Sequence, residues 1–182
     1  MKIAYTTTNG QGDTDRLLTR LASRLDGAGA RLCGTVQTNH DAPDRHGCDM
    51  DVTVLPSGPI IRISQSLGRH ARGCRLDPDA LEQAVTLSEL VLDGGADILI
   101  VNKFGKHEAA GGGYRGLIAK ALERDVPVLV GLSRLNAEAF REFSGGLAEA
   151  VQPDLPELLD WCRQAGVPVS MEDAVAHEGS PV

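Results

Sequence analysis

Polar residues between Thr6 and Thr14 form a segment with the composition of a phosphate-binding loop. The segment reads Thr6-Thr7-Thr8-Asn9-Gly10-Gln11-Gly12-Asp13-Thr14 and leads from a short β-prone run into a helix. Helix N-termini favour anions, because their backbone N–H groups are free and the helix dipole is positive there. The residues that we expect to bind phosphate are Gly10, Gln11, Gly12, Asp13 and Thr14. An ordinary strand–helix turn capped by Asp13 or Thr14 is the alternative.

The same segment satisfies only half of the phosphate-loop pattern G-x-x-x-x-G-K-[ST]. Gly12 and Thr14 stand at the positions of the second glycine and the hydroxyl residue. Thr7 replaces the first glycine, and Asp13 replaces the lysine. Since that lysine reaches the β- and γ-phosphates, the replacement puts a carboxylate where the pattern has a cation.

A second polar segment follows the apolar run Ile98-Leu99-Ile100-Val101. It begins Asn102-Lys103-Phe104-Gly105-Lys106-His107-Glu108 and continues to Gly113. Polar residues directly after a buried strand are candidates for a binding site. A solvated loop with Lys103 and Lys106 in water is the alternative.

Alternating strands and helices must position these two segments. Helical spacing of leucines predicts a helix from Leu17 to Leu25, and Asp77-Pro78-Asp79 has the sequence of a helix start. Further helices are predicted around Leu117, around Phe140 after an Asn136 cap, and over residues 154–165. Extended runs are predicted at residues 2–6, 31–37, 51–55, 60–64, 97–101 and 126–130, with an exposed loop over 38–47. This order predicts an α/β fold with a mainly parallel sheet and helices on both faces.

Two features of that sheet are expected from its turns and edges. Pro56-Ser57-Gly58-Pro59 predicts a β-hairpin inserted between residues 51–55 and 60–64. Ligands bind beyond the carboxyl ends of parallel strands, where both polar segments are expected to lie.

The ordered segments resemble a small nucleoside-triphosphatase family with a phosphate-loop fold, best known from thermophiles. That family has a phosphate loop, a hairpin around a Ser-Gly turn, a V-D-x-x-A-L helix start and a strand ending D-E-I-G-K-M-E. The corresponding residues here are Gly12–Thr14, Ser57-Gly58, Leu76–Leu81 and Asn102–Glu108, in the same order over roughly residues 1–145. The form V-N-K-F-G-K-x-E is more similar still to a bacterial subgroup, for which the family name implies a fold rather than an activity. The resemblance implies a P-loop NTPase-like three-layer sandwich.

Three departures from the family pattern concern its catalytic groups. Asn102 stands at the position of the Asp that holds Mg²⁺ through water, and Lys103 at that of the Glu expected to polarise the attacking water. Asp13 replaces the phosphate-binding lysine, whereas Lys106 and Glu108 agree with the pattern. The resemblance thus implies Asn102, Lys103 and Glu108 as the catalytic positions and Lys106 as a phosphate contact, with Mg²⁺ accompanying a nucleoside triphosphate. Because phosphoryl transfer depends on positioning and charge neutralisation, we expect at most weak or atypical hydrolysis.

Two of these departures are related as a charge exchange. The phosphate-loop lysine and the acids at the strand end face each other across the site in this family. We hypothesise that Lys103 either pairs with Asp13 or supplies the missing phosphate cation from the opposite wall. Near a protein surface, opposite charges 4 Å apart attract by roughly 4 kcal/mol at an effective dielectric of 20, before desolvation.

Arginine, histidine and cysteine residues elsewhere give two further expectations. Arg69, Arg72 and Arg75 could fold over an anion as a lid, because guanidinium groups suit phosphate; an exposed basic loop is the alternative. His46 with Cys48, and His70 with Cys74, would supply four ligands for tetrahedral zinc. Without a C-x-x-C pair, buried thiols are the favoured interpretation, so we expect no metal bound by protein side chains alone.

Composition limits the remaining possibilities. The chain has 182 residues, a formal net charge of −7, 42% hydrophobic residues and 3% aromatic residues. Its length predicts one domain over residues 1–166, followed by a polar acidic tail at 167–182. Low positive charge and few aromatics predict no nucleic-acid partner. Short apolar runs, no recognisable signal peptide and scattered cysteines predict a cytoplasmic protein without membrane contact.

The leading interpretation is a nucleotide- or phosphate-binding protein with altered catalytic residues. A non-catalytic module for another tetrahedral oxyanion, or for a partner protein, is the second interpretation. A zinc- or thiol-dependent protein centred on Cys48 and Cys74 is the third.

Overall fold

The computed structural model describes residues 2–10, 12–41, 48–65 and 75–170. The helices are α1 (Asp13–Gly27), α2 (Pro78–Asp93), α3 (Lys106–Ala109), α4 (Arg115–Glu123), α5 (Ala137–Phe143) and α6 (Leu155–Ala165), with a 3₁₀ turn, η1, at Arg134–Asn136. The strands are β1 (Ile3–Thr6), β2 (Leu32–Asp41), β3 (Cys48–Val54), β4 (Ile60–Arg62), β5 (Ser64–Gln65), β6 (Arg75–Leu76), β7 (Ile98–Phe104), β8 (Val128–Leu132) and β9 (Glu149–Ala150).

Seven strands form one mixed sheet in the order β4-β3-β2-β7-β8-β1-β9. The pairs β2–β7, β7–β8, β8–β1 and β1–β9 are parallel, whereas β2–β3 and β3–β4 are antiparallel. The predicted hairpin at β3–β4 is therefore confirmed. Its strand β3 also pairs antiparallel with β2 on the other side. The separate pair β5–β6 is also antiparallel.

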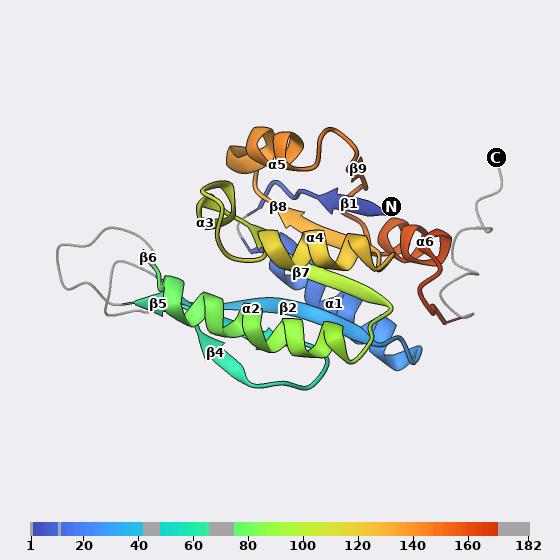
Figure 1. Cartoon of the computed structure of the whole chain (residues 1–182), viewed down its shortest axis with the longest axis horizontal. Coiled ribbons are helices and arrows are strands. Elements are labelled where there is room, and N and C mark those ends of the chain that lie inside the picture. Colours follow the sequence, from blue (N-terminus) through green and yellow to red (C-terminus); the bar gives the residue numbers. More distant parts are fainter. Residues whose placement is uncertain (1, 11, 42–47, 66–74, 171–182) are drawn as a thin grey trace.

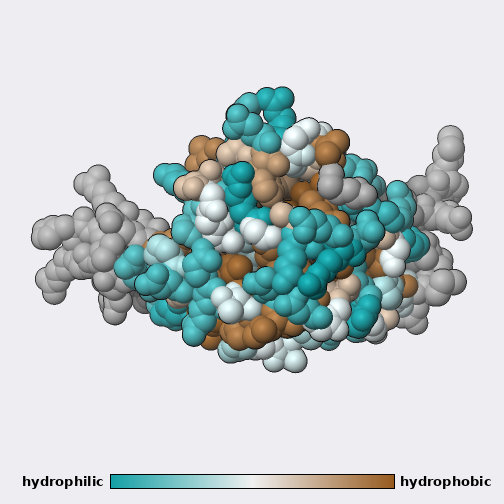
Figure 2. Space-filling model, viewed as in Figure 1, coloured by the Kyte–Doolittle hydropathy of each residue, from teal (hydrophilic) through white to brown (hydrophobic). Residues whose placement is uncertain are grey.

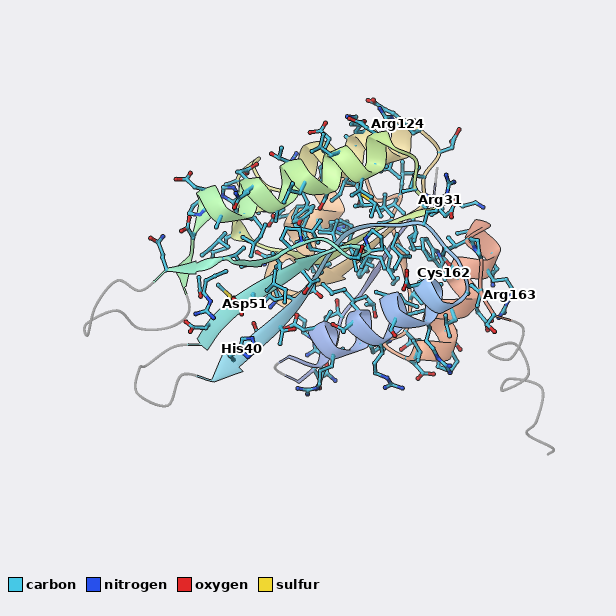
Figure 3. All side chains as sticks on the ribbon, turned by 90° about the horizontal axis from the view of Figure 1, so that it is seen from below. Arg31, His40, Asp51, Arg124, Cys162 and Arg163 are labelled. Atoms are coloured by element: carbon cyan, nitrogen blue, oxygen red, sulfur yellow. The ribbon has the colours of Figure 1, made fainter. Side chains whose placement is uncertain are left out.

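Helices cover both faces of this sheet and give the predicted three-layer sandwich (Figure 1). One apolar core contains residues of α1 and α6, including Leu18, Leu21 and Leu158. The opposite core contains residues of α2, α4 and α5, including Leu81 and Ile118. Figure 3 shows α6, marked by Cys162, beside α1 on the same face. On the face that carries α2 and α4, apolar side chains are interspersed with hydrophilic ones (Figure 2).

Helix starts follow local chemistry, with one difference from expectation. The Asp77 side chain accepts hydrogen bonds from the N–H groups of Asp79 and Ala80, as its sequence predicts. The cap of α1 is neither Asp13 nor Thr14 but Gly12, whose φ of 76° is in the left-handed region. This conformation favours glycine because it has no Cβ. Asn136 precedes α5, but its Nδ2 donates to Ser133 Oγ at 3.0 Å instead of its side chain capping the helix.

Several elements are longer than their patterns predict. β2 continues to Asp41, so residues 38–41 are strand rather than loop, because they pair with β3 through to Cys48. β7 continues to Phe104 and therefore includes Asn102 and Lys103. Val167 is buried against the α1–α6 core, so the packed chain reaches beyond residue 166. The remainder of the predicted tail, residues 171–182, lies outside the described residues. Among the described helices, none is long and apolar enough to cross a membrane.

Candidate functional site

A pocket of about 290 Å³ lies where β1, β7 and β8 end beside the first turn of α1. Its lining residues are Thr8, Asn9, Gly10, Gly12, Thr14, Asp15, Lys103, Leu132, Ser133 and Arg134. The first four belong to the β1–α1 loop (residues 7–12), and the others to α1, β7 and the β8–η1 junction. The pocket therefore occupies the carboxyl edge of the parallel strands, as the sequence predicts.

Hydroxyl groups and two cations give this pocket its polar character. Thr8 Oγ1 and Thr14 Oγ1 lie 2.8 Å apart, which joins the β1–α1 loop to the helix. On the opposite wall, the Arg134 guanidinium donates to Asn9 Oδ1. Lys103 is exposed and forms no ion pair with any residue that the structure describes. Hydroxyls, cations and helix-terminal N–H groups together suit an oxyanion.

Asp15, another lining residue, has a buried carboxylate. Its residue is 4% exposed, and its Oδ1 accepts a hydrogen bond from Asn102 Nδ2 at 2.7 Å. Its Oδ2 accepts a hydrogen bond from Asn39 Nδ2. Asn39 Oδ1 in turn accepts from Gln37 Nε2 at 2.7 Å. The chain of amides thus connects α1 with the ends of β7 and β2.

The Asp13–Lys103 pairing that the charge exchange suggested is not what the structure shows. Asp13 instead forms an ion pair with Arg16, one turn along α1. Its carboxylate lies against Gly10, where a Cβ atom would be only 1.9 Å from Asp13 Oδ2. Asp13 is not a lining residue, so Lys103 faces the pocket without it. The second alternative, in which Lys103 supplies the phosphate cation, is the one compatible with this arrangement.

Glu108 has a different setting from the one expected for a catalytic acid. It is 3% exposed, and its Oε2 accepts from the backbone N–H of Gly105 at 2.8 Å, in a capping interaction at the start of α3. The residue does not line the pocket, and neither do Asn102 and the exposed Lys106. Of the three expected catalytic residues, only Lys103 is a lining residue.

Several predicted residues lie outside the described residues: Gln11, Arg69, Arg72, His46, His70 and Cys74. Nothing is described of the side chains of Cys48 and Arg75 either. The described cysteines, Cys33 and Cys162, are buried, and burial raises the pKa of each thiol to about 12. Within the described ranges, no group of three or more His, Cys, Asp or Glu side chains is arranged to hold a metal ion.

Four lining residues lie outside the two predicted segments: Asp15, Leu132, Ser133 and Arg134. Ser133 and Arg134 directly follow the apolar run 126–132, so the strand-end rule that singled out Asn102 and Lys103 also applies to them. Asp15 is adjacent to Thr14, but its burial depends on amide donors 24 and 87 residues away. No local pattern indicates such partners.

The residues present do not fit the Mg²⁺ ligand set that the family resemblance implies. Asn102 stands in place of the strand-end acid, and its amide Nδ2 donates a hydrogen bond to Asp15. Its Oδ1 is buried with no hydrogen-bond partner among the described residues. The next residue is a lysine, whose positive charge opposes a cation at the same place. The pocket therefore lacks the pair of acids that the family resemblance implies for holding Mg²⁺ and activating water.

Comparison with solved structures shows that the fold is P-loop NTPase-like. THEP1 from the hyperthermophile Aquifex aeolicus has a TM-score of 0.56 and 17% sequence identity, with 84% of this chain and 89% of that chain covered. A human cancer-related nucleoside triphosphatase has a TM-score of 0.60 and 19% identity, with 91% of this chain and 98% of that chain covered. Similarity at these identities concerns the fold alone.

A curated relative is more similar in sequence but much longer. The molybdenum import ATP-binding protein ModC 2 of Bradyrhizobium diazoefficiens is 35% identical over 155 residues. The match covers 84% of this chain but only 17% of that protein. A family model described as "Protein of unknown function (DUF2478)" matches residues 3–161. Because this match spans most of the sequence and all the strands of the main sheet, the chain belongs to the DUF2478 family.

Proposed function

We propose that the pocket binds the phosphate group of a nucleotide or of a similar phosphorylated anion. The observation that carries this proposal is the position of Lys103, a cation without an ion-pair partner among the described residues, in a pocket that also contains Arg134. The hydroxyl groups of Thr8, Thr14 and Ser133 supply hydrogen-bond donors. Lys103 thus takes over the role of the missing phosphate-loop lysine from another wall.

We propose further that hydrolysis of a bound nucleoside triphosphate is weak. Asn102 is held by Asp15 and cannot act as a base, and Glu108 is engaged at the start of α3. A lysine at position 103 stabilises negative charge but does not accept a proton from water while it is charged. Loss of the base and of the metal ligand leaves charge stabilisation as the main contribution.

The remaining predicted contacts belong to the same proposal. Arg69 and Arg72 would close over the ligand from the segment between β5 and β6, and Gln11 would present its N–H from the β1–α1 loop. Lys106 would contact the ligand only if it extends beyond the pocket, because Lys106 is not a lining residue. We propose a cytoplasmic setting, in which the thiols of Cys33 and Cys162 stay reduced.

A second candidate function is the binding of a tetrahedral oxyanion without turnover. The observation that favours it is the 35% identity with part of the Bradyrhizobium diazoefficiens protein named for molybdenum import. Molybdate, like phosphate, is a tetrahedral oxyanion. The pocket volume of about 290 Å³ is sufficient for such an ion.

Calorimetric titration distinguishes the two functions. ATP, GTP, inorganic phosphate and molybdate are titrated separately into the purified chain, with and without Mg²⁺, and the nucleotide mixtures are then assayed for free phosphate. Saturable nucleotide binding with little phosphate release supports the first proposal. Molybdate binding without nucleotide binding supports the second, and the absence of binding by all four ligands contradicts both.

A further inference from the structure

We infer that Arg134, oriented by Asn9, makes this pocket specific for ligands in which two phosphate groups are linked. The inference rests on the proposed function, because it names the class of phosphorylated anion that the same pocket accepts. Neither residue is among those that the family resemblance implies for phosphate binding or catalysis.

The first step is that the guanidinium of Arg134 is held in place without being neutralised. Its Nη2 donates to Asn9 Oδ1 in the β1–α1 loop, and both residues line the pocket. An amide oxygen accepts a hydrogen bond but carries no net charge. Other described arginines, such as Arg31, Arg62 and Arg124, form ion pairs with aspartates. Arg134 forms no ion pair with any residue that the structure describes, so its positive charge remains available to a ligand.

The second step is that the two cations of the pocket come from opposite sides. Lys103 belongs to β7, whereas the Arg134 guanidinium is held at the loop that follows β1. The strand order β7-β8-β1 places β8 between them. Neighbouring strands lie about 4.8 Å apart, so the chain segments that carry Lys103 and Asn9 are separated by roughly 10 Å. A ligand with two linked phosphate groups can meet one cation with each group, whereas a single phosphate group is shorter than this separation.

The third step is the size of the pocket. Its volume of about 290 Å³ corresponds to roughly ten water molecules at about 30 Å³ each. A single phosphate group is equivalent in size to about five such molecules, and a diphosphate group to about nine. The pocket therefore has room for a second phosphate group, and the hydroxyl groups of Thr14 and Ser133 offer further donors.

The remaining charged lining residue does not neutralise these cations. Asp15 is the one carboxylate among the described lining residues, and its two oxygens accept hydrogen bonds from Asn102 and Asn39. Lys103 and Arg134 are therefore left without a described counter-ion. Because a diphosphate carries more negative charge than a single phosphate, it gains more from two such cations.

Two substitutions at position 9 separate the orientation of a charge from simple support of the loop. Asn9→Ala removes the acceptor and releases the Arg134 guanidinium. Asn9→Asp keeps an acceptor oxygen and strengthens the contact, but it neutralises the positive charge. If Asn9 only stabilised the loop, Asn9→Asp would behave as wild type. If Asn9 positions a charge for the ligand, both variants lose the specificity, as does Arg134→Ala.

Exposed positions on two helices provide the matched controls. Arg20→Ala on α1 removes a positive charge, and Gln83→Glu on α2 adds a negative one. The experiment measures the Kd values of inorganic phosphate and pyrophosphate by calorimetry, at neutral pH and without Mg²⁺. Urea unfolding of each variant checks that it folds.

We expect wild type and both controls to bind pyrophosphate at least about tenfold more tightly than phosphate. In Arg134→Ala, Asn9→Ala and Asn9→Asp the ratio of the two Kd values should fall to about threefold or less. The Kd of phosphate should change less than that of pyrophosphate, because Lys103 and the hydroxyl groups still bind the first phosphate group.

A ratio near one in wild type, or an unchanged ratio in Arg134→Ala, overturns the inference while the anion pocket of the proposed function stands. Asn9→Asp with the wild-type ratio overturns the role given to Asn9. An equal fall in the controls also overturns the inference, because net charge alone would then explain the preference. Binding of ATP without binding of pyrophosphate overturns it as well. If phosphate, pyrophosphate and ATP all fail to bind, the proposed function itself fails.

Discussion

Asp15 Oδ1 accepts a hydrogen bond from Asn102 Nδ2 at 2.7 Å, and this contact connects the first turn of α1 with the end of β7. Both residues are nearly inaccessible, at 4% and 2% exposure. Position 102 is where the family resemblance expects an acid, and the structure explains why an amide is required here. A second carboxylate would face Asp15 without a donor between them.

Asn102→Asp should therefore destabilise the fold although it introduces the acid that the family resemblance expects at this position. Two buried carboxylates in contact cannot both be charged at low cost, and one of them retains a proton. We expect a loss of about 3–5 kcal/mol near neutral pH, the range for a buried charge that loses its partner. Urea unfolding measures this loss, which should become smaller as the pH falls and the pair takes up a proton.

The compensating variant supplies the control for that prediction. Adding Asp15→Asn to Asn102→Asp restores one carboxylate beside one amide. Most of the lost stability should return, since the two atoms again form a donor–acceptor pair. If Asn102→Asp alone is as stable as wild type at neutral pH, the hydrogen bond between Asp15 and Asn102 does not decide which residue position 102 tolerates.

Lys103→Ala should weaken phosphate binding. Lys103 contributes a charge-assisted interaction, and hydrogen bonds to charged groups are worth about 1.5–3 kcal/mol. We expect the Kd of inorganic phosphate to rise roughly ten- to one-hundredfold for Lys103→Ala. Lys103→Arg keeps the positive charge, so its Kd should lie between those of wild type and Lys103→Ala. Arg20→Ala on the exposed surface of α1 is the matched loss of a positive charge. Equal weakening by both variants would indicate only a general effect of net charge.

Glu108→Ala should reduce the stability of the fold because the Glu108 side chain caps the start of α3. The Oε2 atom accepts from the N–H of Gly105 at 2.8 Å at the start of α3, and losing such a cap costs about 0.5–2 kcal/mol. Glu108→Gln keeps a carbonyl oxygen and should lie closer to wild type. Thermal unfolding tests both variants. A Glu108→Ala protein with unchanged stability but lower phosphate release would instead support the catalytic role predicted from the sequence.

Gly131→Ala should be among the most disruptive small substitutions in β8. A Cβ at this position would be 2.1 Å from the backbone oxygen of Asn102 and 2.9 Å from Thr14 Cγ2. Relief of that overlap requires backbone movement, at a cost of about 1–3 kcal/mol. Gly116→Ala in α4 is the control, because its Cβ meets no atom within 4 Å and alanine favours helix. Equal unfolding midpoints for the two variants would contradict this packing.

Loss of the ion pair between Arg31 and Asp97 should lower the stability of the fold at acid pH, where Asp97 becomes protonated. Hydrogen bonding from the Arg31 guanidinium holds the pKa of Asp97 below its ordinary value. A depressed pKa means that the stabilisation is present above the unfolded-state value and is lost as the pH falls through the folded-state value. The Tm difference between wild type and Asp97→Asn should therefore shrink as the pH falls below about 5 and the Asp97 carboxylate becomes protonated. A difference independent of pH would exclude this contribution.

Sequence patterns were sufficient for the architecture because they are local. The buried run at Ile98, the cap at Asp77 and the turn at Ser57-Gly58 each determine one element through neighbouring residues. Alternation of strands and helices then restricts the topology to few possibilities. The extension of β2 to Asp41 was missed, because its polar residues become strand only by pairing with β3.

The site was harder to predict because several of its contacts join residues that are far apart in the sequence. Lys103, Gly12 and Thr14 could be found because they follow strand ends or match a motif. The charge exchange offered Lys103 as one of two alternatives for Asp13, although Arg16 lies one turn away on the same helix and competes at lower entropic cost. Asp15 depends on contacts between three elements, which no spacing along the chain encodes.

The contact between Asp15 and Asn102 also restricts the order in which this site can change by single substitutions. If Asp15 appears while position 102 is still an acid, the chain has two acids in contact and is destabilised. If the acid at 102 is first exchanged for an amide, no such intermediate arises. Once Asp15 is present, a return to an acid at 102 meets the same barrier. Substitutions at this pair are thus coupled, because the residue at one position decides which residues the other tolerates.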